Sequence, residues 1–151
     1  MAVQLLILRH GDADLGGPDQ CRQLSALGRE QVHRQALRHY QEISAVEVVV
    51  SSPYVRAVQT TEIVTQATAV KSIEWLDDLA PHGSLRRVET FLQQHQASNV
   101  LLVSHLPLVD MLIDYLTGET VNSMGTASLA SLSMDYPAQG MATLHWNHYV
   151  D

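Results

Sequence analysis

Arginine and histidine side chains follow two apolar runs of this chain, at the points where buried strands would end. Arg9 and His10 come directly after the run 5–8, and His105 follows the run 100–103 with one residue between. In an open α/β sheet, ligands bind beyond the carboxyl ends of the strands. We therefore expect these three side chains to meet at one edge of a sheet.

A second arginine belongs to the same expected group. Arg56 follows a third apolar run, 46–50, and the sequence Ser-Ser-Pro at 51–53. Ser52 is expected to cap a helix with Pro53 at its first position, which places Arg56 in the first turn. The exposed backbone N–H groups of a first turn favour anions. Two arginines and two histidines in one place suit the binding of a phosphoryl group and nucleophilic attack on it.

The chemistry expected of this group is transfer of a phosphoryl group to a histidine. Arg9 and Arg56 can hold the equatorial oxygens, whose charge must be stabilised. His10 can attack through one ring nitrogen if the other is protonated and anchored, and a backbone carbonyl of the loop at Gly11 is the expected anchor. Gly11 is also expected to let the backbone turn sharply. His105 would donate a hydrogen bond, or carry a positive charge, beside the phosphoryl group.

The elements that must position these residues alternate between strand and helix. Strands are expected near 3–8, 46–50, 73–76 and 99–103, helices after Ser25, Ser52, Ser84 and at Pro107, and a hairpin of 127–133 with 141–146. The alternation predicts one domain, residues 1–151, with a three-layer α/β/α sandwich around a mostly parallel sheet. In the first helix, Leu27, Val32 and Leu37 are expected on the buried face.

Composition limits the classes of partner. Hydrophobic residues make up 46% and charged residues 17%, which is typical of a globular protein. The net charge of -7 argues against nucleic acid or an anionic membrane as the main partner. Cys21 is the only cysteine, and no apolar stretch reaches the roughly 18 residues of a membrane span. We expect a cytoplasmic location without a signal peptide.

Taken together, these motifs resemble the histidine phosphatase superfamily. The resemblance rests on Leu-Arg-His-Gly at 8–11, Ser-Ser-Pro-Tyr-Val-Arg-Ala-Val-Gln-Thr at 51–60 and the late histidine at position 105. The chain is similar in particular to the SixA-type branch of phosphohistidine phosphatases, through Arg-His-Gly-Asp-Ala at 9–13 and Leu-Val-Ser-His-Leu-Pro-Leu at 102–108. The similarity extends over nearly the whole chain and implies a phosphoglycerate-mutase-like fold.

The resemblance also implies roles for the residues already singled out. By this likeness His10 is the phospho-accepting nucleophile, and Arg9, Arg56 and His105 complete a phosphate pocket that needs no metal or other cofactor. The implied substrate is a phosphohistidine on a signalling protein, such as a His-containing phosphotransfer domain. The partner could equally be a phosphocarrier of sugar transport, and the oligomeric state is left open.

Further contacts to phosphate or substrate are expected from Gly11, Arg22, Ser104 and Leu106, although a solvated loop arginine is an equally good interpretation of Arg22. Larger members of the superfamily supply a carboxylic acid that protonates the leaving group. No carboxylate falls on that position here, and Asp78 is only an outside candidate. An alkoxide leaving group needs a proton donor more than an imidazole does, so the absence favours phosphohistidine over phosphate esters.

Few loops are long enough to enclose the expected site. Only 11–23 and 117–126 can form a rim. The sequence therefore predicts an open, shallow site that can admit a side chain of another protein, and a deep closed pocket would contradict it.

Other functions stay open or are excluded by spacing. A small-molecule phosphomonoesterase of the same superfamily is the first alternative, and a phosphate-binding module without catalysis is the second. A cysteine phosphatase would need Arg six positions after Cys21, where Leu27 stands. Asp-Ala-Asp at 12–14 has the form of a magnesium-dependent haloacid-dehalogenase motif but lies past the strand end. His145 and His148 could pair on a metal but have no third ligand at a suitable spacing.

Overall fold

Six strands form one mixed sheet in the computed structural model, which describes residues 2–150. The strands are β1 (Val3–Arg9), β2 (Val48–Ser51), β3 (Ile73–Trp75), β4 (Asn99–Ser104), β5 (Leu129–Met134) and β6 (Ala142–His148), in the spatial order β3-β2-β4-β1-β5-β6. The first four are mutually parallel, while β5 runs antiparallel to both β1 and β6. The predicted mostly parallel sheet and its C-terminal hairpin are confirmed.

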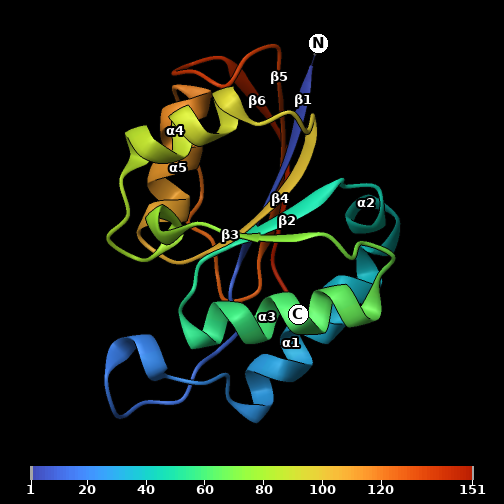
Figure 1. Cartoon of the computed structure of the whole chain (residues 1–151), viewed down its shortest axis with the longest axis vertical. Coiled ribbons are helices and arrows are strands. Elements are labelled where there is room, and N and C mark those ends of the chain that lie inside the picture. Colours follow the sequence, from blue (N-terminus) through green and yellow to red (C-terminus); the bar gives the residue numbers. More distant parts are fainter. Residues whose placement is uncertain (1, 151) are drawn as a thin grey trace.

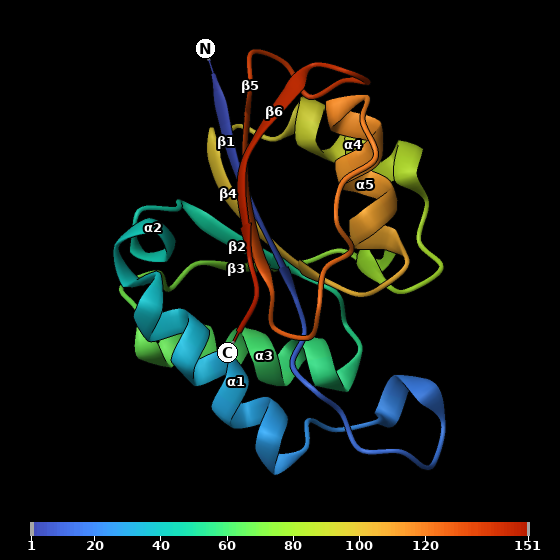
Figure 2. The ribbon, with the colours of Figure 1, turned by 180° about the vertical axis from the view of Figure 1, so that it is seen from behind.

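Helices cover both faces of this sheet (Figures 1 and 2). One layer holds α1 (Ala26–Arg38), α2 (Tyr40–Ser44) and α3 (Val55–Ala67), the other holds α4 (Leu85–Gln94) and α5 (Leu108–Thr117), and two short 3-10 helices, η1 (Asp19–Cys21) and η2 (Asp77–Leu79), lie in connecting loops. The three-layer α/β/α sandwich is therefore confirmed. Within residues 2–150, no helix has both the length and the apolar character needed to span a bilayer.

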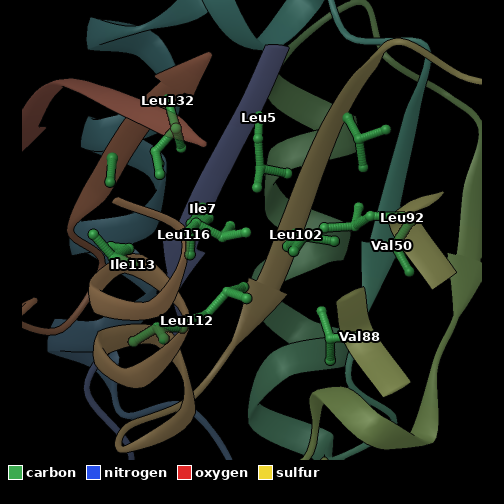
Figure 3. Close-up of a cluster of buried hydrophobic side chains, with 14 of the residues drawn as sticks. Leu5, Ile7, Val50, Val88, Leu92, Leu102, Leu112, Ile113, Leu116 and Leu132 are labelled. Atoms are coloured by element: carbon green, nitrogen blue, oxygen red, sulfur yellow. The ribbon is translucent and has the colours of Figure 1, made fainter. Parts of the chain in front are cut away.

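Alternate residues of the central strands pack into two separate cores. In β1, Leu5 and Ile7 join the core under α4 and α5 (Figure 3), whereas Leu6 and Leu8 join the core under α1 and α3. Successive side chains of a strand point to opposite faces, so a strand covered on both sides must be apolar throughout. This explains why the sequence before Arg9 is an unbroken apolar run.

The buried face of α1 differs from the prediction. Leu27 and Leu37 are 57% and 52% exposed, while Gly28, Val32 and Gln35 are buried. Gly28 sets this orientation because a Cβ on it would lie 1.9 Å from the carbonyl oxygen of Asp12. The close approach of the loop after β1 turns the small residue inward and both leucines outward.

The start of α3 also differs from the prediction. The helix begins at Val55 with Tyr54 before it, so neither Ser52 as the cap nor Pro53 as the first helical residue is correct. The Ser52 hydroxyl instead accepts the backbone N–H of Tyr54 at 3.2 Å, outside the helix. Arg56 still lies in the first turn of α3, where the sequence placed it.

Candidate active site

The carboxyl ends of β1 and β4 lie side by side and bring the expected site residues together. Arg9, the last residue of β1, pairs with Ser104, the last residue of β4, and the backbone N–H of His10 donates to the Ser104 carbonyl at 3.1 Å. The ring centroids of His10 and His105 are therefore only 4.9 Å apart. Arg56 reaches the same place from α3, with Nε 3.3 Å from Nε2 of His10.

The two ring nitrogens of His10 have different partners. Nδ1 lies 2.7 Å from the carbonyl oxygen of Gly11, which can only accept, so Nδ1 carries the proton. Nε2 is then the unprotonated nitrogen, and the Nε–H of Arg56 donates to it. The backbone anchor expected near Gly11 is present, and the nitrogen with a lone pair faces the arginine.

Gly11 is needed for close packing rather than for a left-handed backbone conformation. Its φ does not fall in the left-handed region that favours glycine. A Cβ on Gly11 would lie 2.6 Å from the carbonyl oxygen of Gly28 and 2.9 Å from Cγ2 of Val32. The absence of a side chain lets the loop after β1 lie directly against α1.

Both histidines are neutral in this environment. Burial lowers the pKa of His10 to about 4, because the charges of Arg56, Arg9 and Arg22 add to burial and outweigh the opposing effect of the hydrogen bond to the Gly11 carbonyl. Burial, together with His10, Arg56 and Arg9, lowers the pKa of His105 to about 2. Of the two alternatives left open for His105, the neutral hydrogen-bond donor is therefore favoured over the charged form.

The arginines are held by backbone carbonyls and by one carboxylate. Nη1 of Arg9 donates to the carbonyl oxygen of Met124 at 3.0 Å. Nη1 of Arg56 donates to the carbonyl oxygen of Asp19 at 2.6 Å, and its Nη2 lies 3.2 Å from the Asp19 carboxylate. The other oxygen of that carboxylate lies 3.2 Å from Nη1 of Arg22. Asp19 thus ties η1 to α3 through the two arginines.

A small cavity of about 220 Å³ opens over these groups. It is lined by Arg9, His10, Asp12, Ala13, Arg22, Arg56, Leu106 and Thr126. The two segments expected to form a rim, 11–23 and 117–126, both contribute to the lining. Arg22 and Leu106, expected to contact phosphate or substrate, also line the cavity. The volume is below the ~300–1,000 Å³ of ordinary small-molecule pockets. Three arginines around so small a space suit a single anionic group.

Two of the candidate residues, Ser104 and Asp78, do not line this cavity. The hydroxyl of Ser104 donates to the Leu79 carbonyl at 2.6 Å and does not line the cavity, whereas the Ser104 carbonyl accepts the backbone N–H of His10. Asp78 lies in η2 and does not line the cavity. Among residues 2–150, no group of three or more His, Cys, Asp or Glu side chains is arranged to hold a metal.

Two residues of the site were missed by the sequence reasoning. Asp19 occurs in a glycine-rich loop without any recurring pattern, and only its spacing of three residues from Arg22 hints at an ion pair. Ser52 has the residue type of a helix cap, yet its hydroxyl lies 2.7 Å from Nε2 of His105.

Comparison with known proteins identifies the class. A family model of the histidine phosphatase superfamily (branch 1) matches residues 5–80. The chain belongs to the histidine phosphatase superfamily.

Within this class, the chain is similar to the SixA proteins. It is 35% identical over 150 residues to phosphohistidine phosphatase SixA of Escherichia coli (strain K12), covering 95% of this chain and 92% of that protein. It is 30% identical to the SixA homolog of Haemophilus influenzae, covering 88% of this chain and 89% of that protein. The solved structure of the protein histidine phosphatase SixA complexed with tungstate has a TM-score of 0.89 at 34% identity, over 97% of both chains. The resemblance to the SixA-type branch is confirmed.

Proposed function

We propose that this protein is a phosphohistidine phosphatase that removes phosphate from a phosphohistidine of another protein. One observation carries the proposal: His10 presents an unprotonated Nε2 beside Arg56, while Nδ1 is anchored on the Gly11 carbonyl. A neutral imidazole held in this way is a nucleophile at neutral pH. The SixA proteins to which the chain is similar are phosphohistidine phosphatases by name.

The first step transfers the phosphoryl group to His10. Arg9 and Arg56 hold the equatorial oxygens and offset their charge. Nε2 of His10 bonds to phosphorus as the P–N bond of the substrate breaks, and the electron pair of that bond goes to the departing imidazole, which takes up a proton from solvent water. His105 stabilises the same oxygens by hydrogen bonding. In the second step water attacks phosphorus, the bond to Nε2 breaks, and inorganic phosphate leaves.

The carboxylates near the cavity favour a P–N substrate over a phosphate ester. Asp12 accepts the hydroxyl of Ser25 at 2.6 Å. Burial raises the pKa of Asp19, but the hydrogen bond from Arg22 and the charge of Arg56 outweigh it, so the pKa is lowered. Asp19 is therefore ionised and cannot donate a proton to an alkoxide, whereas an imidazole leaving group depends less on such a donor.

The size of the cavity favours a substrate carried by a macromolecule. A volume of about 220 Å³ accepts a phosphoryl group and part of a ring but does not enclose a larger metabolite. The rest of the substrate must lie outside, as it does when a side chain projects from another protein. The class of partner is a phosphohistidine-bearing signalling protein, for which a phosphotransfer domain or a phosphocarrier is a suitable form.

Two other expectations are part of this proposal. Residues 1–151 act as one domain, which is supported by the two cores sharing one sheet. The protein works in the cytoplasm, which is supported by the exposed free thiol of Cys21.

The test is phosphate release from a phosphohistidine-bearing phosphotransfer domain, with EDTA present. We expect the wild type to release phosphate and His10→Ala to be slower by roughly a thousandfold or more, because it lacks the nucleophile. His33→Ala is the matched control, since His33 is exposed on α1 and should retain full activity.

Three outcomes would contradict the proposal. Cleavage of sugar phosphates at matching rates would favour a small-molecule phosphomonoesterase. Release by His10→Ala at the wild-type rate would remove His10 from the chemistry. Phosphate binding without phosphoenzyme formation would indicate a binding module.

A further inference from the structure

His105 has one satisfied and one unsatisfied ring nitrogen. Nε2 lies 2.7 Å from the hydroxyl of Ser52, whereas Nδ1 is buried and has no hydrogen-bond partner within residues 2–150. The side chain is only 1% exposed. Such an atom needs an explanation, and a ligand that arrives later is one.

The hydrogen bonds of Ser52 decide which nitrogen of His105 carries the proton. The Ser52 oxygen already accepts the backbone N–H of Tyr54 at 3.2 Å. If it also accepted from Nε2–H, its own hydroxyl proton and the lone pair on Nδ1 would both be buried without partners in the described chain. If the hydroxyl donates to Nε2, only the Nδ1–H is left over. The second arrangement has fewer unsatisfied groups and is therefore favoured.

The neighbours of the His105 ring indicate what its free N–H can bind. The ring of His10 packs against it, with 4.9 Å between the ring centroids. The positive charges of Arg56 and Arg9 help to lower the pKa of His105. Tyr54 closes another side with its ring edge-on, 5.2 Å away between centroids. His105 does not itself line the cavity, but His10 does, so a phosphoryl group bound to His10 would bring acceptor oxygens next to the His105 ring.

We propose that Ser52 is a positioning residue that holds His105 in the Nδ1–H tautomer, so that a neutral His105 donates a hydrogen bond to the phosphoryl group. The contact of Ser52 Oγ with His105 Nε2 and the unpartnered, buried Nδ1 carry this assignment. It rests on the proposed function for the identity of the ligand, but the tautomer is a property of the free protein.

The direct test is the tautomer itself, measured by long-range ¹H–¹⁵N NMR of the histidine rings in the wild type. We expect His105 to carry its proton on Nδ1 and His10 also on Nδ1. A proton on Nε2 of His105 would overturn the proposal, whatever the enzyme hydrolyses. This measurement needs no variant, so a folding defect cannot obscure it.

The second test uses variants and inorganic phosphate as the probe. Ser52→Ala should lose the fixed tautomer and bind phosphate about tenfold or more weakly, which is the effect of losing one hydrogen bond to a charged group. Ser52→Thr keeps the hydroxyl and should restore most of the affinity. Ser51→Ala is the matched control, because Ser51 is also fully buried but donates to the Ser52 and Ala57 carbonyls.

The outcomes separate this proposal from the proposed function. Unchanged tautomer and phosphate affinity in Ser52→Ala would overturn the role of Ser52 even if the wild type hydrolyses phosphohistidine. Equal losses in Ser52→Ala and Ser51→Ala would also overturn it, since they would show general loosening. With phosphohistidine as substrate, we expect Ser52→Ala to lower kcat more than it changes KM, because the donated hydrogen bond strengthens as charge develops.

Discussion

At the scale of single residues, Gly11 supports the site in two ways, through its carbonyl group and through its lack of a side chain. Its carbonyl oxygen accepts Nδ1–H of His10 at 2.7 Å and thereby leaves Nε2 unprotonated. Its missing side chain lets that carbonyl stay in place while the backbone lies against Gly28 and Val32 of α1. The reactivity of His10 therefore depends on a backbone position that α1 holds.

The substitution Gly11→Ala should disturb both the hydrogen bond to His10 and the packing against α1. The new Cβ would need to displace the Gly28 carbonyl at 2.6 Å, so we expect a loss of stability of about 2 kcal/mol and a shift of the Gly11 carbonyl away from His10. Urea unfolding and the rate of phosphoenzyme formation would measure the two effects. Gly16→Ala is the comparison: it has positive φ but open space, so it should cost about 1 kcal/mol of stability and no activity. An active, stable Gly11→Ala would contradict the packing argument.

At the scale of elements, each part of the site is held by a different connection. The helices expected after Ser25 and Ser84 are present, and both serines cap them: Ser25 accepts the N–H of Gly28 in α1, and Ser84 accepts the N–H of Arg87 in α4. η1 is one of the short elements that no pattern predicted, together with α2 and η2. Its Asp19 is bound to Arg56 of α3 through both a carbonyl and a carboxylate oxygen.

Asp19→Asn should strengthen phosphate binding. The carboxylate places a negative charge beside the arginines that must receive an anion, whereas the bond from Arg56 to the Asp19 carbonyl would remain. We expect about threefold tighter binding of inorganic phosphate at low salt, with a smaller gain at high salt, since the group is largely exposed and screened. Calorimetric titration would measure it. Asp135→Asn changes the net charge equally but lies on the hairpin turn after β5, so it should have no effect, and an equal gain there would refute the local explanation.

At the scale of the whole molecule, the site lowers stability in acid. His10 and His105 have pKa values of about 4 and about 2 in the folded protein, against about 6.5 when unfolded. Below pH 6.5 the unfolded chain binds protons that the folded chain does not. The protein is therefore not destabilised by these groups above pH 6.5, and stability is lost as the pH falls toward 4 for His10 and toward 2 for His105.

Urea unfolding between pH 7 and pH 5 should show this loss. Each of the two buried histidines contributes a slope of up to roughly 1.4 kcal/mol per pH unit below pH 6.5. His10→Asn should reduce the slope, while His33→Asn, at an exposed position on α1, should leave it unchanged. Stability that is constant or rises as the pH falls from 6.5 to 5 would contradict the neutral state of both histidines.

The sequence by itself determined the sheet, the layers and the meeting of Arg9, His10, Arg56 and His105. These follow from local features, because an apolar run defines a buried strand and the residue after it lies at the carboxyl edge of the sheet. The tertiary structure decided the rest. Ser104 turned to the Leu79 carbonyl, Ser52 bound His105 in place of a helix end, and Asp19 joined two arginines. The direction of a hydroxyl or carboxylate depends on which partner from elsewhere in the chain lies within about 3 Å, and that distance exists only after folding.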